Sequence, residues 1–290
     1  MQHNLVDEMR TADASEELSV ERRGSLALIT LNRPRALNAL NIAMRRKLAD
    51  SYPRFARESM NYAVVIQSVG GKAFCAGGDV RELVRLGRED KAQARAACAE
   101  EYALNWLHEC FSKPTISLID GPVMGSGVGI TQYGTHRVAG EGYRFAMPET
   151  AIGLFPDVGT AWVLSRMPDS IGMYLGLTGR GIGRADAYAL GLLTHCIPAQ
   201  RFEEITTALI DTWPVDTLLD ERHVDPGPRE LAPYASQIAG CFSAPSVVGM
   251  VKWPAASWRF TSSARASSAG LSGSMVRAKR TFASVYSWPQ

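Results

Sequence analysis

Short apolar runs alternate with amphipathic stretches along the chain, and glycine or proline separates most of them. The runs 63–69 and 115–119 are short, mostly apolar and rich in β-branched residues, which is typical of buried strands. After Asn41, apolar residues recur at about helical spacing, and the Asn41 side chain can cap the helix. Two further runs, 17–23 and 26–31, flank a Gly-Ser pair and predict a hairpin.

The remainder of the chain continues this alternation. Further helices are predicted at 80–87, 91–111, 160–166, 171–177 and 184–190, and further strands at 136–138, 144–146 and 193–197. Strand, glycine turn and helix following one another in this way indicate an α/β fold.

Composition and charge restrict the class of protein. The chain has 290 residues, of which 46% are hydrophobic and 21% charged, as in ordinary globular proteins. No apolar run approaches the length of a membrane span and no signal peptide is recognisable, so we expect a cytoplasmic protein without a membrane partner. The net charge of +2 includes six basic residues and no acid in 252–290. The rest is net acidic and gives no reason to expect a nucleic acid partner.

The thiols and histidines predict no metal site. The five cysteines are dispersed and form no CxxC pair, which indicates reduced thiols rather than a disulfide framework or a zinc site. His108, His136 and His195 lack the spacing of metal ligands. We therefore expect these residues to have structural or surface roles.

The segment 145–159 is largely apolar, yet it contains two carboxylates, Glu149 and Asp157, each directly after a proline. A proline fixes its own φ and restricts the residue before it, so both carboxylates lie on stiff turns. In apolar surroundings they are candidates for an acid or base with a shifted pKa. The alternative interpretation is a buried loop in which both cap helices.

Two glycine-rich turns, 77–79 and 125–127, each follow a predicted strand and open a predicted helix. Small residues there let a ligand reach backbone N–H groups, and two such turns can direct two donors at one oxygen. A dinucleotide fingerprint is the competing interpretation, but Gly125-Ser-Gly-Val-Gly129 does not fit GxGxxG. Alone, each turn is better explained by close packing. As a pair before the two-carboxylate segment, they favour acyl chemistry.

Four motifs together resemble the enoyl-CoA hydratase/isomerase (crotonase) superfamily: 32–34 with 38–40, 72–79, 125–127 and 145–149. Within that superfamily, the segment 147–159 is similar to the 3-hydroxyisobutyryl-CoA hydrolases. The resemblance implies an α/β fold, a spiral of β-β-α repeats, followed by a C-terminal helical region that closes over the site. On this basis we expect a disordered N-terminal arm over 1–16, a crotonase-like core over 17–200 and a helical lid over 201–251.

The resemblance also assigns roles to residues of the two turns. It implies that an acyl-CoA thioester binds with its carbonyl oxygen on the backbone N–H groups of Gly78 and Ser126, with Gly77 as the alternative to Gly78. Family members usually have glycine where this chain has Ser126. The N–H survives that change, so the oxyanion hole is expected to survive if φ at Ser126 is negative.

Three carboxylates complete the implied site. Glu149 and Asp157 match catalytic positions, and together with Ser126 and Glu101 they match substrate-binding positions. Without the resemblance, Glu101 would be interpreted as a solvated glutamate of a helix. CoA is part of the substrate, and we expect no separate cofactor.

One difference from the hydratases affects the expected reaction. Hydratases of the superfamily use two glutamates, of which the first falls at Gly129 and the second at Glu149 of this chain. Hydration of a C=C bond needs the second carboxylate, so hydratase activity is disfavoured. We expect hydrolysis of a short 3-hydroxyacyl-CoA thioester, 3-hydroxyisobutyryl-CoA first, in valine breakdown. The alternatives are an enoyl-CoA hydratase/isomerase and a non-catalytic acyl-CoA-binding remnant, and a homo-oligomer is left open.

Residues 252–290 form an atypical tail rich in serine, arginine and tryptophan. They contain nine serines, three of the six tryptophans and no clear helical period. Our hypothesis is that a frame change or early stop replaced the usual C-terminal region. The alternative is a basic, aromatic tail that binds a membrane or a nucleic acid, although no amphipathic face supports this.

Overall fold

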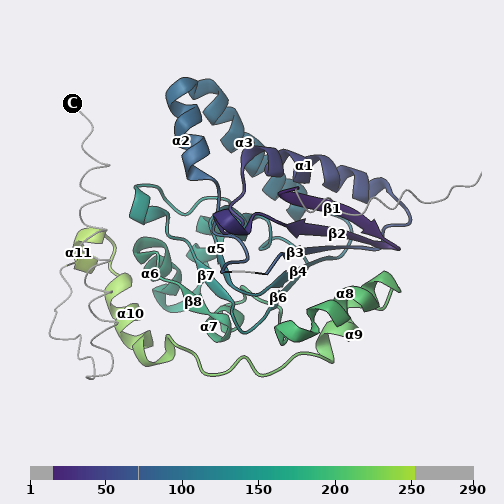
Figure 1. The fold of residues 1–290 in the computed structure, drawn as a ribbon. Coiled ribbons are helices and arrows are strands. Elements are labelled where there is room, and N and C mark those ends of the chain that lie inside the picture. The colour runs from purple at the N-terminus through teal and green to yellow at the C-terminus, as the bar shows by residue number, and fades with distance from the viewer. Residues whose placement is uncertain (1–15, 71, 252–290) are drawn as a thin grey trace, which may run out of the picture.

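The computed structural model of the protein describes residues 16–70 and 72–251 (Figure 1). The predicted N-terminal arm, 1–16, lies outside the described residues except for Glu16, and the predicted tail, 252–290, lies outside them entirely. The larger sheet has six strands in the order β1-β2-β3-β4-β6-β9. Its strands are β1 (Leu18–Arg23), β2 (Leu26–Leu31), β3 (Ala63–Ser68), β4 (Thr115–Ile119), β6 (His136–Ala139) and β9 (His195–Cys196). β1 and β2 form the predicted antiparallel hairpin, and all other neighbours are parallel.

A second sheet contains β5 (Pro122–Met124), β7 (Arg144–Ala146) and β8 (Ile182–Gly183) in the order β5-β7-β8. β4 leads directly into β5, and β6 into β7, so consecutive strands belong to different sheets before a helix follows. Gly121, between β4 and β5, has a φ of 118° and lies against the backbone of Phe74, which leaves no room for a side chain. The predicted α/β fold with its β-β-α repeat is confirmed.

Five of the helices were predicted with both bounds, and each begins at the predicted residue and ends within two residues of the predicted one. All α-helices of the described residues follow in chain order. They are α1 (Ile42–Arg57), α2 (Val80–Glu89), α3 (Lys91–Glu109), α4 (Ser126–Gly129), α5 (Thr160–Ser165), α6 (Ile171–Thr178), α7 (Arg184–Ala189), α8 (Phe202–Ile210), α9 (Val215–Asp220), α10 (Ala235–Phe242) and α11 (Val247–Val251). Within the described parts of the chain, none of them is both long and apolar enough to cross a membrane.

Side-chain caps explain where the helices around the later site begin. Asn41 accepts a hydrogen bond from the N–H of Met44 at 2.8 Å and starts α1, as predicted. The Asp79 side chain does the same for α2 through the N–H of Glu82 at 3.1 Å. Asp90 separates α2 from α3 and caps α3. A cap of this kind stabilises a helix by about 1 kcal/mol.

The core forms on both faces of the six-stranded sheet, because alternate residues of a strand point to opposite sides. In β2, Ala27 and Ile29 face α1, whereas Leu26 and Leu28 face α8 and α9. All four side chains are fully buried. Figure 1 shows the same arrangement, with α1 above the sheet and α8 and α9 below it.

The region 201–251 contains the predicted helices, but α8 and α9 lie against the sheet. Their apolar residues, among them Ile205, Leu209 and Leu218, fill the second core cluster. The described residues of 201–251 contribute nothing to the lining of the cavity described below. A lid formed by this region therefore stays a prediction.

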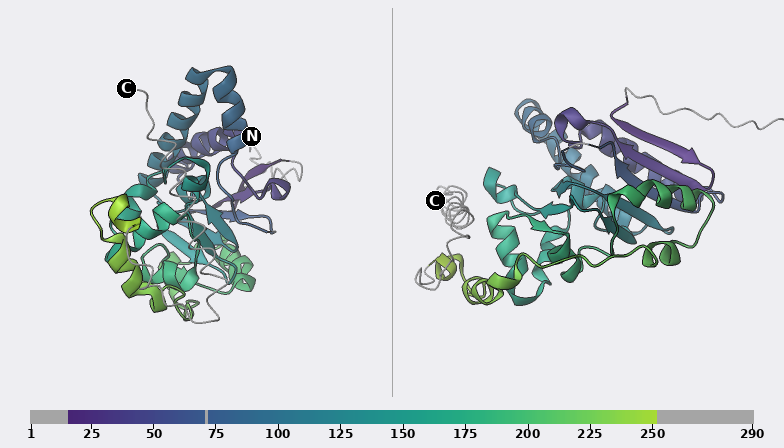
Figure 2. Two further views of the ribbon diagram at one scale, coloured as in Figure 1. Left: turned by 90° about the vertical axis from the view of Figure 1, so that its left-hand side faces the viewer. Right: turned by 60° about the horizontal axis from the view of Figure 1, so that its bottom comes forward.

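The long helix α3 connects the core to the site. It packs against α2 and against α1. Figure 2 shows α2 and α3 as an antiparallel pair that stands away from the sheets. The C-terminal half of α3 thus enters the body of the protein, where Glu101 and the residues after it become available to the site.

Candidate active site

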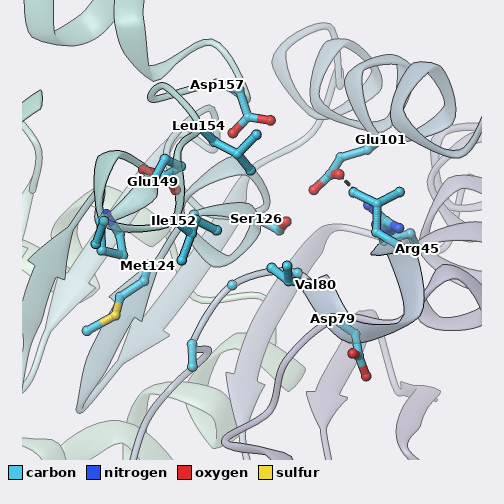
Figure 3. A pocket seen from close by; sticks show the side chains of 17 residues that line it. Arg45, Asp79, Val80, Glu101, Met124, Ser126, Glu149, Ile152, Leu154 and Asp157 are labelled. Carbon is cyan, nitrogen blue, oxygen red and sulfur yellow. Dashed lines mark hydrogen bonds and ion pairs between the residues drawn. The ribbon is translucent and has the colours of Figure 1, made fainter. Parts of the chain in front are cut away.

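A cavity of about 250 Å³ lies where the two glycine turns, α3 and the segment 148–157 meet (Figure 3). Its wall contains glycines and apolar side chains together with three carboxylates that the sequence singled out, Glu101, Glu149 and Asp157. Figure 3 shows Glu149 and Asp157 on one side of the cavity, Glu101 on the other, and Ser126 between them. The structure therefore brings the predicted residues together.

Backbone hydrogen bonds hold the two glycine turns side by side. The N–H of Cys75 donates to the carbonyl oxygen of Pro122 at 3.1 Å, and the N–H of Met124 donates to the carbonyl oxygen of Cys75 at 3.0 Å. A Cβ at Gly78 would lie 2.8 Å from Oγ of Ser126, so a side chain at Gly78 would displace the Ser126 hydroxyl, which lies between the two turns. This explains the requirement for a small residue at the first turn.

The N–H groups of Gly78 and Ser126 donate no hydrogen bond to any described residue. Ser126 is the first residue of α4, where an N–H has no partner within the helix. Its φ is not positive, so the condition set for the serine is met. Gly77, the alternative donor, has a φ of 110° and also lines the cavity. Two unpaired donors in one wall can bind a carbonyl oxygen that gains negative charge.

Glu149 begins a short 3₁₀ helix, Glu149–Ile152, and is only 8% exposed. Its side chain caps no helix, so the capping interpretation is wrong for this residue. Oε2 is buried without a hydrogen-bond partner among the described residues. Burial, reinforced by the negative charge of Asp157, raises the pKa of Glu149 to about 7. A carboxyl group with this pKa exchanges protons readily near neutral pH and suits a general base or nucleophile.

Asp157 lies on a tight turn just before α5 and does not cap that helix, whose N-cap is Gly159. The next residue, Val158, has a φ of 45°, which is rare for a β-branched residue and indicates local strain. The hydroxyl of Tyr133 donates to the carbonyl oxygen of Val158 at 2.6 Å and holds the turn. Burial raises the pKa of the Asp157 carboxyl, and a hydrogen bond from Tyr102 opposes that rise.

Glu101 is buried in the wall formed by α3 and pairs with Arg45 of α1. Its other oxygen, Oε1, has no partner among the described residues. The interpretation of Glu101 as a solvated helix glutamate is therefore wrong. Its neighbour Glu100 does lie at the surface, where it pairs with Arg46. Figure 3 shows the Arg45–Glu101 pair directly at the cavity.

The sequence reasoning missed Arg45 and Tyr102 as partners of the site. A signal for Arg45 was present, because it precedes Leu48 and Tyr52 by three and seven residues and so falls on the apolar stripe of α1. A basic residue on such a stripe needs a buried partner. Tyr102 directly follows Glu101 in a segment, 100–102, that also resembles the 3-hydroxyisobutyryl-CoA hydrolases, but no role was predicted for it.

The other candidate residues have the structural roles that were expected. Cys75 is fully buried, and burial raises the pKa of its thiol to about 12, so it is not a nucleophile. His136 and His195 pair with aspartates away from the cavity, and burial lowers the pKa of His108 to about 4. In the described segments, no cluster of three or more potential ligands could hold a metal ion.

Comparison with known proteins identifies the family. The enoyl-CoA hydratase/isomerase family model matches residues 26–270. The chain belongs to the enoyl-CoA hydratase/isomerase family. It is 39% identical over 246 residues to the mitochondrial 3-hydroxyisobutyryl-CoA hydrolase of Xenopus tropicalis, covering 81% of this chain and 64% of that protein. It is 36% identical over 250 residues to the mitochondrial 3-hydroxyisobutyryl-CoA hydrolase of Homo sapiens, covering 83% and 65%. The chain thus spans less than two thirds of the length of these relatives.

Solved structures of the enoyl-CoA hydratase/isomerase family share the fold. A carnitinyl-CoA dehydratase from Mycobacterium thermoresistibile is 31% identical with a TM-score of 0.82, covering 93% of this chain and 80% of that one. An enoyl-CoA hydratase from Rhodobacter sphaeroides 2.4.1 is 31% identical with a TM-score of 0.77, covering 92% and 74%. Similarity of fold therefore does not distinguish a hydrolase from a hydratase. The residues of the site have to be compared instead.

Gly129 is the position at which the resemblance places the first glutamate of the hydratases. A Cβ at Gly129 would lie 2.8 Å from Oδ1 of Asn105 and 3.0 Å from Cβ of Val158. Both neighbours are buried, so neither can simply move into solvent. The space beside Gly129 is filled, and this enoyl-CoA hydratase/isomerase family member has no second carboxylate there.

Proposed function

We propose that the protein hydrolyses a short 3-hydroxyacyl-CoA thioester, with 3-hydroxyisobutyryl-CoA as the favoured substrate, to the free acid and CoA. The observation that carries this proposal is that two backbone N–H groups without a hydrogen-bond partner lie in the same cavity as the buried carboxylate of Glu149, whose Oε2 also has no partner among the described residues. Relatives named 3-hydroxyisobutyryl-CoA hydrolase, 36–42% identical to the chain, support it. The corresponding role is a step of valine breakdown.

In this mechanism the thioester carbonyl oxygen accepts hydrogen bonds from the N–H groups of Gly78 and Ser126. The negative charge that develops on the oxygen during attack is stabilised there without reorganisation of water. Removal of one such donor reduces turnover by about 10²–10³-fold. No cofactor is needed beyond the CoA carried by the substrate.

Glu149 acts in one of two ways. As a general base it removes a proton from water, which attacks the carbonyl carbon and displaces CoA thiolate. As a nucleophile it attacks that carbon itself, and water then cleaves the mixed anhydride that has formed. Both routes require the ionised carboxylate. After a single turnover in ¹⁸O-labelled water, label in Glu149 identifies the nucleophilic route, because water that cleaves the anhydride at the Glu149 carbon leaves its oxygen there.

Asp157 accepts a hydrogen bond from the 3-hydroxyl of the substrate in this proposal. A plain acyl thioester would leave the half-buried carboxylate without that partner, and such a site rejects the analogue that lacks the hydroxyl. Oε1 of Glu101, on the facing wall, is a second acceptor without a partner among the described residues. Together, the Asp157 carboxylate and Oε1 of Glu101 would make the cavity selective for acyl groups that carry a hydroxyl.

Enoyl-CoA hydration is the second candidate, because a solved family structure 31% identical to the chain has that name. The missing carboxylate at Gly129 and the filled space beside it count against hydration. A non-catalytic acyl-CoA-binding protein is disfavoured by Glu149, because a buried unpaired carboxylate destabilises a protein unless it has a function.

The test is release of free CoA thiol from 3-hydroxyisobutyryl-CoA by the purified protein, with hydration of crotonyl-CoA measured in parallel. We expect thiol release that is lost in Glu149→Gln and retained in Glu100→Gln, which makes the same change at the surface of α3. Hydration of crotonyl-CoA without thiol release would refute the proposal. Binding of CoA without either reaction would favour the acyl-CoA-binding alternative.

Two further attributes belong to the proposal. Cytoplasmic localisation stays a prediction, and the relatives from Xenopus tropicalis and Homo sapiens are named mitochondrial. A homo-oligomer is tested by light scattering coupled to size-exclusion chromatography.

A further inference from the structure

Tyr102 follows Glu101 on α3 but contacts a different part of the site. Its phenol O–H donates a hydrogen bond of 3.0 Å to Oδ2 of Asp157, which lies 55 residues further along the chain. The hydrogen bond joins the rigid α3 to the turn before α5. Because Tyr102 occupies Oδ2, the other oxygen of Asp157 is left for a ligand.

We propose that Tyr102 is a positioning residue that orients the Asp157 carboxylate toward the 3-hydroxyl of the substrate and so sets the preference for hydroxyacyl over plain acyl thioesters. This inference rests on the proposed function and assigns a role to a residue outside the lining of the cavity. Tyr102 itself contacts Asp157 and not the reacting atoms.

The geometry explains why Asp157 needs such a partner. The turn fixes the backbone of Asp157, but backbone geometry alone does not select the rotamer of its carboxylate. α3 has 19 residues and packs against α1 and α2, which makes it a rigid support. A tyrosine carries two rotatable side-chain bonds and loses little entropy when it holds one position. A phenol on this helix therefore fixes the carboxylate at a small entropic cost.

The hydrogen bond also affects the charge of Asp157. Burial raises the pKa of this carboxyl, whereas the Tyr102 hydrogen bond and the positive charge of Arg45 lower it. The titratable and charged groups that face Asp157 are Cys98, Glu101 and Tyr102 of α3, Arg45 of α1, Tyr133 and Glu149. The pKa of Tyr102 is raised by burial and by the Asp157 charge, so its phenol remains a donor at neutral pH. Removal of the phenol oxygen therefore favours protonation of Asp157.

The test compares the affinities of 3-hydroxyisobutyryl-CoA and isobutyryl-CoA by calorimetry at pH 6, 7 and 8. The parent protein carries Glu149→Gln, so that bound thioester is not consumed and Glu149 does not titrate. We expect Tyr102→Phe to reduce the preference for the hydroxyl about tenfold, with the larger loss at the lowest pH. The affinity for isobutyryl-CoA is expected to stay within about twofold, since that thioester has no hydroxyl.

Tyr188→Phe is the matched control. Tyr188 is 37% exposed, against 45% for Tyr102, and its ring contacts His223 outside the cavity. The same loss of one oxygen there is expected to leave both affinities and their pH dependence unchanged.

Three results would overturn the inference: equal weakening of both thioesters by Tyr102→Phe, no change in either, or no preference for the hydroxyl in the parent. The proposed function is tested separately, by thiol release from the protein with Glu149 intact. Loss of the hydroxyl preference in Tyr102→Phe would support the positioning role even if the chain released no thiol.

Discussion

The pH dependence of stability in Glu149→Gln is the sharpest test of the site. The pKa of Glu149 rises from its ordinary value of 4.5 to about 7 because the carboxyl group is buried and lies near Asp157. Folding therefore favours the protonated form. The contribution of protonated Glu149 to the free energy of unfolding is complete below the pKa of the unfolded chain, and it is lost as pH rises through about 7. The difference between the two pKa values corresponds to about 3 kcal/mol at pH 8.

Glutamine carries no charge and cannot lose this stability. We therefore expect the free energy of unfolding of Glu149→Gln, relative to wild type, to rise by about 2–3 kcal/mol between pH 4.5 and pH 8. The assay is urea unfolding at a series of pH values, with the denaturant slope held in common between the two proteins. Any effect of the unpaired glutamine amide on stability is independent of pH. The diagnostic quantity is therefore how the stability difference between variant and wild type changes with pH.

The control is Glu100→Gln, because the Arg46 ion pair lowers the pKa of Glu100. Its substitution is expected to give no gain at alkaline pH. A Glu149→Gln protein whose stability relative to wild type does not change with pH would refute the reasoning, and so would a gain confined to acid.

Three further predictions concern other parts of the site. Gly78→Ala places a methyl group in the space between the two turns and is expected to reduce thiol release by at least about 10²-fold. The control is Gly87→Ala in α2, where a methyl group has open space. It should preserve the rate and stabilise the protein by about 0.5–1 kcal/mol. Arg45→Met leaves the buried carboxylate of Glu101 unpaired and should destabilise the protein by about 3–5 kcal/mol in chemical unfolding. Adding Glu101→Gln should restore much of the lost stability. If the double variant is no more stable than Arg45→Met, the two residues are not coupled. Turnover of 3-hydroxyisobutyryl-CoA, measured as kcat/KM, should increase with pH through about 7, because Glu149 must be ionised. A flat profile between pH 5 and 9 would contradict that role.

Local signals predicted much of the fold. The β2 and β4 strands, the Asn41 and Asp79 caps and the glycine turns each depend on residues close together in sequence, and the structure confirms them. The positions of α8 and α9 on the sheet could not be derived in this way. Apolar residues predict that a helix face is buried, but not which surface buries it.

The candidate site shows the same division. Gly78, Ser126, Glu149 and Asp157 were found because their motifs are continuous in sequence, and all four line the cavity. The partners that tune them were missed, because Arg45 reaches Glu101 across 56 residues and a similar span separates Tyr102 from Asp157. Such pairs form only when helices pack in a particular register, and a single sequence contains no measure of that register.

The filled space beside Gly129 has a consequence for how this family changes its chemistry. A carboxylate at that position requires Asn105 of α3 and Val158 of the strained turn to give way together. Each of these changes alone would open a void or create a clash while adding no new activity. In this chain, a single substitution toward a second carboxylate is therefore expected to cost stability without adding an activity. Divergence between hydrolysis and hydration is expected to have needed several linked substitutions, and a laboratory conversion should start from libraries that vary all three positions at once.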